Sequence, residues 1–284
     1  MISSSDVSVA RITTGGTSPL IRWPGGKRAL VAQLTNCFPN SFRKYYEPFF
    51  GGGALFFALT PDKAILSDIN PDLICAYTVV RDNPIALIDE LRGYENTEDF
   101  YYKIRASRPK LDVEKAARLL FLTRHSFNGI YRVNLNGDFN VPYGKKYHVT
   151  AFDSEKILEV HSLLDSVVLL VSDFEAATAC AEEGDIIYFD PPYTVAHANN
   201  GFVKYNENIF SWADQVRLAE HARVLASKGC FVAISNADHE SVDKLYQGFN
   251  KIVISRFSVI AASSAHRRKI TECLYFLGGN SLDR

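Results

Sequence analysis

The sequence contains no hydrophobic run long enough to cross a bilayer. Its first residues, 1–17, are rich in Ser, Thr and Gly and lack the hydrophobic core of a secretory signal. We therefore expect a flexible tail over residues 1–19. We also expect a cytoplasmic protein that has no membrane partner.

Cysteine is sparse and widely scattered, and no CxxC pair or cluster of cysteine with histidine occurs. The five cysteines are Cys37, Cys75, Cys180, Cys230 and Cys273. This pattern argues against a disulfide framework and against a structural zinc site, so we expect no metal and a reducing compartment.

An excess of charge is also missing, because 31 Lys and Arg residues face 32 Asp and Glu residues. The molecule as a whole is therefore not a basic nucleic-acid binder. Two stretches, 103–110 and 251–269, nevertheless hold several basic residues and no acid. Either stretch could neutralise phosphates, although a solvated face is the simpler interpretation of each alone.

The first third of the chain predicts alternating strands and helices. Residues 44–50 predict a strand that runs into Gly51-Gly52-Gly53, residues 54–59 a helix, and residues 63–68 a second strand that ends in Asp68. An Asn-Pro-Asp sequence then begins another helix. This order predicts an α/β fold with a doubly wound, mostly parallel sheet.

The alternation stops between residues 81 and 162, where helical segments carry interleaved aromatic and basic residues. We interpret this region as an inserted, mostly helical domain within a sheet domain of residues 20–80 and 163–284. Alternation resumes with two apolar runs, 167–172 and 186–189, each of which predicts a buried strand.

The second of these strands ends abruptly at Asp190-Pro191-Pro192-Tyr193. Proline cannot donate to a sheet ladder, so the strand must stop at Asp190. Taken alone, the tetrapeptide is either a rigid turn or a site that presents a carboxylate and an aromatic ring at the carboxyl edge of the sheet. Other parts of the chain decide between these interpretations.

The glycine turn and Asp68 together predict a site for an adenosine-containing cofactor. Glycine lets the backbone approach a ligand closely, and an acid that ends the second strand can accept hydrogen bonds from ribose hydroxyls. Phe56 stands where a dinucleotide fingerprint needs its third glycine. Because S-adenosylmethionine has no phosphate, the methyl donor suits this turn better than a dinucleotide does.

A second glycine-rich segment, RWPGGK at residues 22–27, fails as a phosphate-binding loop. Ile21 replaces the first glycine of such a loop, and Arg28 replaces its Ser or Thr. Lys27 and Trp23 could instead meet the carboxylate and the cationic sulfur of the methyl donor. A surface turn is the alternative.

These groups together suit methyl transfer to an amine on a nucleobase. Such an amine is a poor nucleophile, because its lone pair is delocalised into the ring. Asp190 and the carbonyl of Pro191 can accept its two hydrogens, while Tyr193 offers a face for stacking. The base must leave the helix stack to reach such a pocket.

The motif order resembles that of the Dam-type (D12 class) adenine-specific DNA methyltransferases over residues 20–276. The matching segments are RWPGGK, EPFFGGGA, SDIN, DPPY, ISN at 234–236 and RHSFNGIYRVNLNGDFNVPYG at 124–144. The resemblance implies a Rossmann-like class I methyltransferase fold with a target-recognition domain at 81–162. It also implies S-adenosylmethionine as the cofactor and double-stranded DNA as the partner.

The resemblance implies three groups of site residues. The catalytic group is Asp190, Pro191, Pro192 and Tyr193. The cofactor group is Trp23, Gly25, Lys27, Glu47, Phe49, Gly51, Gly53, Asp68, Asp173, Phe174 and Asp190. The DNA group is Arg22, Arg124, Phe127, Asn128, Arg132, Asn134, Lys146, Arg267 and Arg268.

Within these groups, Asp173 and Phe174 would bracket the adenine of the cofactor and Phe127 would insert into the duplex. Arg132 would read a guanine, with a phosphate contact as the alternative. Phe202 and Tyr205 would clamp the flipped base or pack in the core.

The resemblance favours a GATC-like site and a monomer, and it leaves a cognate restriction endonuclease open. Two departures bear on the recognised sequence. Arg22 replaces a common lysine, and segment 263–268 lacks an Asn-Gly-Gly found in many members.

Two other functions compete with adenine methylation. Methyltransferases that act on cytosine N4 or on protein glutamine usually carry Ser-Pro-Pro or Asn-Pro-Pro at the tetrapeptide, so Asp190 favours adenine. A DNA-binding regulator without catalytic activity would have no need of Asp190, Trp23 and Lys27 together.

Overall fold

The computed structural model describes residues 10–11, 16–27, 30–134, 136–194, 210–257 and 269–278. Four predicted site residues, Phe202, Tyr205, Arg267 and Arg268, lie outside these ranges. Within the expected tail, β1 (Ala10–Arg11) pairs with β2 (Ser41–Phe42) in a small antiparallel sheet. In the described part of the chain, no helix has the length and apolar character needed to cross a membrane.

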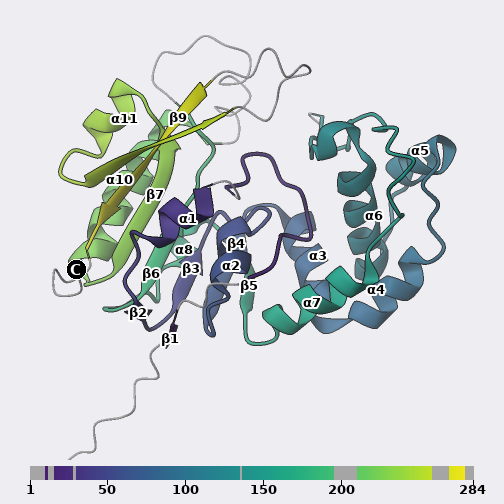
Figure 1. Cartoon of the computed structure of the whole chain (residues 1–284), viewed down its shortest axis with the longest axis horizontal. Coiled ribbons are helices and arrows are strands. Elements are labelled where there is room, and N and C mark those ends of the chain that lie inside the picture. Colours follow the sequence, from purple (N-terminus) through teal and green to yellow (C-terminus); the bar gives the residue numbers. More distant parts are fainter. Residues whose placement is uncertain are drawn as a thin grey trace, which may run out of the picture.

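The main sheet has seven strands in the order β5-β4-β3-β6-β7-β9-β8 (Figure 1). The five strands from β5 to β7 are parallel, and β9 runs antiparallel to both of its neighbours. The strands are β3 (Tyr45–Glu47), β4 (Ala64–Asp68), β5 (Val168–Val171), β6 (Ile186–Phe189), β7 (Phe231–Ala237), β8 (Asn250–Phe257) and β9 (Lys269–Leu277). The predicted doubly wound, mostly parallel α/β fold is confirmed.

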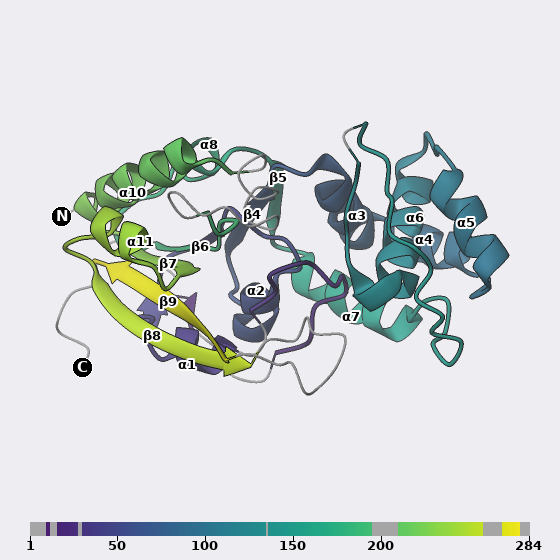
Figure 2. The same ribbon diagram turned by 90° about the horizontal axis from the view of Figure 1, so that it is seen from above.

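Helices cover both faces of this sheet. Figure 2 shows α8 and α10 on one face and α1 and α2 on the other. The helices are α1 (Val31–Thr35), α2 (Ala54–Leu59), α3 (Pro71–Asp82), α4 (Pro84–Leu91), α5 (Glu98–Ala106), α6 (Asp112–His125), α7 (Ser154–Leu164), α8 (Phe174–Ala177), α10 (Trp212–Ser227) and α11 (Glu240–Leu245). Helices α4 to α6 lie beside the sheet, and their assignment to an inserted domain stays a prediction.

The strand order creates a switch point between β3 and β6. The chain passes from β3 to β4 on one side, while β6 pairs with the opposite side of β3. In open α/β sheets, ligands bind in the crevice at the carboxyl ends of the strands at such a point. Glu47 ends β3 and Asp190 follows β6, so both residues lie at the carboxyl ends of the two strands at this point.

One sequence prediction about the sheet is wrong. The run at 167–172 was expected to form a buried strand, but Val168 is 46% exposed and Val171 is 56% exposed. The reason is topological: β5 ends the sheet and pairs only with β4 among the described strands. An apolar run has the same composition in an edge strand as in a central one, so its composition did not reveal its place.

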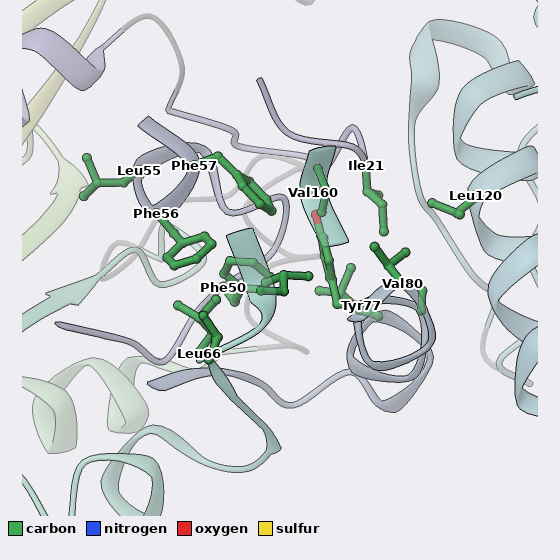
Figure 3. Packing of buried hydrophobic residues seen from close by; sticks show 14 of the residues in the cluster. Ile21, Phe50, Leu55, Phe56, Phe57, Leu66, Tyr77, Val80, Leu120 and Val160 are labelled. Carbon is green, nitrogen blue, oxygen red and sulfur yellow. The ribbon is translucent and has the colours of Figure 1, made fainter. Parts of the chain in front are cut away.

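A single hydrophobic cluster continues from the sheet into the helical region. Figure 3 shows Phe50, Phe57 and Val160 around Tyr77, with Leu120 further toward the helices. Helix α3 carries Tyr77 and contacts α6 and α7 as well as β4 and β5. The expected domain boundary at residue 80 falls inside α3, so the two regions share a core across it.

Candidate active site

A buried lysine lies at the centre of the carboxyl edge. The Nζ atom of Lys27 is 2.8 Å from Asp190 Oδ1 and 3.8 Å from Glu272 Oε2, and it donates to the carbonyl of Gly25 at 2.9 Å. It also lies 4.7 Å from the centre of the Tyr193 ring. The side chains of Lys27 and Glu272 are only 5% and 3% exposed, and that of Asp190 is 18% exposed. Burying a charged group is costly unless it is paired, and here two carboxylates neighbour one ammonium.

Glu272 is a site residue that the sequence interpretation missed. It lies on β9, and its Oε2 accepts the hydroxyl hydrogen of Tyr193 at 2.9 Å. Burial raises the pKa of Tyr193 well above its usual value, and the nearby Asp190 and Glu272 raise it further. Tyr193 is therefore a neutral donor. The only available signal was a carboxylate directly before a run of apolar strand residues.

The glycine turn is shaped by the segment that carries Lys27. Gly51 has a φ of 48°, and a Cβ atom there would lie 2.8 Å from Cδ1 of Trp23. The backbone N–H of Gly51 donates to Asp68 Oδ2 at 2.9 Å, while Asp68 Oδ1 accepts from the N–H of Asn70. The sequence predicted that glycine permits a close approach here. In the structure the ring of Trp23 makes such an approach, and the approach of a cofactor stays a prediction.

Glu47 precedes this turn in the chain and is buried in the protein interior. Its Oε2 accepts from the hydroxyl of Tyr45 at 2.8 Å and from the N–H of Phe56 at 3.2 Å. Desolvation raises the pKa of Glu47 to about 8, and the charge of Asp190 acts in the same direction. This raised pKa favours the neutral acid at pH 7, and the role of Glu47 toward a cofactor stays a prediction.

Asp173 and Phe174 lie together at the start of α8, after β5. Both oxygens of Asp173 accept from Arg217, at 3.0 and 2.9 Å, and the guanidinium carbon of Arg217 lies 4.3 Å from the centre of the Phe174 ring. Phe49 stacks on Phe174 with ring centres 5.7 Å apart. Phe174 is only 2% exposed. The sequence did not predict Arg217, and the adenine-bracketing role of Asp173 and Phe174 stays a prediction.

The N-terminal segment also contacts the helical region. Trp23 stacks on Tyr131 with ring centres 4.5 Å apart and an interplanar angle of 21°. A Cβ atom on Gly129, whose φ is 67°, would lie 2.8 Å from Cδ of Arg22. Arg22 therefore lies against the loop that carries Phe127, whose side chain is 52% exposed.

Three of the predicted DNA-contacting cations are close enough to affect one another. Lys146 donates to the carbonyl of Arg124 at 2.9 Å. Desolvation lowers the pKa of Lys146 to about 8, and the charges of Arg22 and Arg124 lower it further. We call Arg22, Arg124 and Lys146 the cation cluster.

The remaining predicted DNA residues lie on the loop and hairpin after α6. Asn128 has a φ of 55° beside Phe127. Arg132 is exposed and donates through Nε to Asn140 Oδ1 at 2.7 Å. Asn134 Oδ1 accepts two backbone N–H groups, those of Asn136 and Asp138, and so shapes the hairpin turn. The DNA contacts of these residues stay predictions.

Comparison with known proteins identifies the family. Residues 23–260 match the model of the D12 class N6 adenine-specific DNA methyltransferases. The type II methyltransferase M1.LlaDCHI of Lactococcus lactis subsp. cremoris is 39% identical over 272 residues, which cover 92% of this chain and 96% of that protein. The chain belongs to this family. The DNA adenine methylase of Haemophilus influenzae is 32% identical over 270 residues, 92% of this chain and 93% of that protein.

The protein is therefore an adenine-specific DNA methyltransferase with a class I, Rossmann-like fold, and its substrate is DNA. The family implies a methyl donor. The charges at the carboxyl edge suit a cationic donor, because Asp190 and Glu272 outnumber Lys27. The polar groups at this edge can position reactants by hydrogen bonds and charge.

Proposed function

We propose that this methyltransferase transfers the methyl group of S-adenosylmethionine to the N6 amine of an adenine flipped out of duplex DNA, at a GATC-like site. The observation that carries the proposal is the pairing of Lys27 with Asp190 beside Tyr193 at the switch point of the sheet. These groups provide a hydrogen-bond acceptor and an aromatic face next to a cation site.

The cofactor side of the crevice is formed by the glycine turn and its neighbours. Asp68 lies beside Gly51. Its carboxylate can accept a hydrogen bond from a ribose hydroxyl there. Trp23 and Lys27 lie where the amino-acid end of the donor would reach. When bound, the donor supplies an electrophilic methyl group on a positively charged sulfur.

Asp190 acts on the substrate amine. Its carboxylate and the Pro191 carbonyl accept the two N6 hydrogens, which directs the nitrogen lone pair toward the methyl carbon. The amine would displace a neutral thioether from the methyl carbon, and the proton that N6 then loses would pass to the Asp190 carboxylate and from there to solvent. Glu272, whose Oε2 lies 3.8 Å from Lys27 Nζ, offers the ammonium a second carboxylate neighbour while Asp190 accepts from the amine. Tyr193 stacks on the flipped base.

The helical region supplies the DNA contacts. The cation cluster neutralises phosphates, and such contacts fix the register of the protein without reading sequence. Phe127, exposed on the loop after α6, fills the space left in the stack by the flipped base. Arg132 reads a guanine in the major groove, where a bidentate arginine gives about 1–3 kcal/mol of discrimination.

We further propose that the protein acts as a monomer in the cytoplasm. A cognate restriction endonuclease is a second proposal. It is supported by the relatives that carry type II names, including M.MjaIII of Methanocaldococcus jannaschii, which is 36% identical over 264 residues, 84% of this chain and 91% of that protein.

The test is base-resolved mapping of methylated adenine in unmethylated genomic DNA treated with the protein and S-adenosylmethionine. We expect methylation at one short motif, and its loss in Asp190→Ala with DNA binding largely retained. Asp185→Asn is the matched control, because Asp185 is buried just before the amino end of the same strand. We expect this control to methylate normally. Wild-type turnover by Asp190→Ala would contradict the catalytic assignment, and methylated cytosine would contradict the substrate.

A further inference from the structure

The catalytic tetrapeptide has few backbone groups that can hold it in place. Pro191 and Pro192 have no backbone N–H, so neither residue can donate a hydrogen bond that would tie the segment to the sheet. The β6–β7 ladder pairs Phe189 with Ile234 and extends no further along β6. The position of the segment therefore depends on donors that reach its carbonyl groups from other elements.

One such donor is the side chain of Gln215. Its Nε2 donates to the carbonyl oxygen of Pro192 at 3.2 Å. Its Oε1 accepts from Nδ2 of Asn236 at 2.9 Å. Both amide side chains are fully buried. We call Asn236, Gln215 and the Pro192 carbonyl the amide relay.

The local structure of two elements places these amides. Ser211 and Asp214 form a capping box, which fixes the first turn of α10 and brings Gln215 into its second turn. Strand β7 continues beyond Ile234, so Asn236 lies two residues further along, toward the tetrapeptide.

The direction of the amide relay is fixed by the backbone. The N–H of Ala237 donates to Oδ1 of Asn236 at 2.9 Å. A backbone N–H can only donate, so it sets the orientation of the Asn236 amide. That orientation makes Asn236 a donor to Gln215 and makes Gln215 a donor to Pro192.

We propose that Gln215, held by Asn236, is a positioning residue that fixes the catalytic tetrapeptide through the Pro192 carbonyl. This inference rests on the proposed function, because it assigns the tetrapeptide to methyl transfer. The neighbouring residues are anchored separately, since Asp190 pairs with Lys27, Tyr193 donates to Glu272, and Thr194 donates to the Phe210 carbonyl at 2.6 Å. Without Gln215, the segment between Asp190 and Tyr193 loses the side-chain donor that holds its second proline.

The effect of the amide relay falls on the chemical step. Gln215 is buried and contacts the back of the tetrapeptide, so its loss changes the position of Asp190 and the Pro191 carbonyl relative to the amine. A displacement of about 1 Å in a reacting geometry can reduce the rate by about 100-fold. Affinity for the cofactor and for DNA depends on other residues and changes little.

The first test compares Gln215→Leu with Arg223→Met. Arg223 lies on the same helix and also donates to a backbone carbonyl, that of Leu245 at 2.7 Å, away from the site. We expect kcat of Gln215→Leu to fall about 100-fold, with dissociation constants for DNA and S-adenosylmethionine within about threefold of wild type. We expect Arg223→Met to keep the wild-type kcat. A kcat of Gln215→Leu within threefold of wild type would overturn the proposal.

The second test uses Gln215→Glu, which remains decisive if the leucine variant does not fold. A carboxylate cannot donate to the Pro192 carbonyl, whereas a protonated carboxyl group can. Burial raises the pKa of such a carboxyl group. We therefore expect kcat of the variant, divided by that of wild type at each pH, to rise as the pH falls from 8 to 6. A ratio independent of pH would overturn the proposal.

The two proposals fail in different ways. Wild-type protein that binds S-adenosylmethionine but methylates no adenine in DNA contradicts the proposed function. Active wild-type protein with an equally active Gln215→Leu contradicts the amide relay alone. Thermal unfolding of each variant shows whether the variant is folded. A loss of folding would lower the amount of active protein and would leave the pH dependence of kcat unchanged, whereas a loss of positioning would change it.

Discussion

At the scale of single residues, burial changes the chemistry of the groups under the active site. Glu47, Lys27 and Glu272 are all nearly inaccessible to solvent, but they have different partners. Lys27 has carboxylates beside it. Glu47 accepts from two neutral donors, the Tyr45 hydroxyl and the Phe56 N–H, and desolvation raises its pKa to about 8.

Glu47→Gln tests this state of Glu47. Because the pKa of Glu47 is raised to about 8 in the folded protein, folding favours its protonated form. The raised pKa of Glu47 therefore adds to the free energy of unfolding. The added stability is complete below the unfolded-state pKa near 4.5 and is lost as the pH rises toward 8. The stability of the glutamine variant lacks this dependence on pH. As the pH rises from about 4.5 to about 8, the variant should therefore become more stable relative to wild type.

The slope of that difference is at most about 1.4 kcal/mol per pH unit, which is the limit for one proton. Urea unfolding at several pH values measures it. Tyr45→Phe is the companion variant, because it removes one hydrogen bond to Glu47 and leaves the carboxyl group titratable. Parallel pH curves for wild type and Glu47→Gln would show that Glu47 is already ionised in the folded protein.

At the scale of elements, the glycine turn after β3 and the segment that carries Trp23 depend on each other. A methyl group on Gly51 would lie 2.8 Å from the indole ring and would also be strained by the positive φ. The ring also stacks on Tyr131, which limits how far it can move. The turn and the segment therefore behave as one unit.

Gly51→Ala should weaken S-adenosylmethionine binding as well as stability. We expect a loss of about 1–3 kcal/mol in stability from strain and overpacking. We expect a fall of at least tenfold in cofactor affinity, because Trp23 and Lys27 move together. Calorimetric titration measures the affinity. Gly248→Ala is the control, since its φ is 92° but open space surrounds its Cβ position. It should lose stability and keep the affinity.

An outcome in which both glycine variants lose stability equally and both bind cofactor normally would separate the turn from the cofactor site. Backbone strain would then account for the whole effect of Gly51→Ala on stability, and the contact with Trp23 would have no role in cofactor binding.

At the scale of the whole molecule, the cation cluster combines residues from distant parts of the chain. Arg22 comes from the N-terminal segment, Arg124 from the end of α6 and Lys146 from the loop before α7. Desolvation lowers the pKa of Lys146 to about 8, and the charges of Arg22 and Arg124 lower it further. A phosphate placed there would relieve the repulsion and raise that pKa again.

DNA binding should therefore take up a proton near pH 8 to 9. Calorimetry in two buffers with different ionisation enthalpies measures the number of protons. Lys146→Arg should bind DNA with less proton uptake, because arginine stays charged at this pH. Lys146→Ala should reduce the slope of log affinity against log salt concentration by about 0.9. Equal proton uptake by wild type and Lys146→Arg would place Lys146 away from the phosphates.

The sequence by itself determined the local features of the site. The apolar run before Asp190, the two prolines, the glycines after β3 and the acid at the end of β4 each specify a backbone state or a chemical group through covalent structure alone. Their order along the chain was enough to predict the doubly wound sheet and the carboxyl edge at which they meet.

Tertiary structure alone decided the contacts between distant segments. Glu272 and Gln215 lie within ordinary strand and helix sequences, and only the antiparallel placement of β9 and the packing of α10 bring them to the tetrapeptide. The exposure of β5 likewise depends on its position at the sheet edge. The physical reason is that pairing and packing select partners far away in the chain, and no local pattern of residues records which partners are selected.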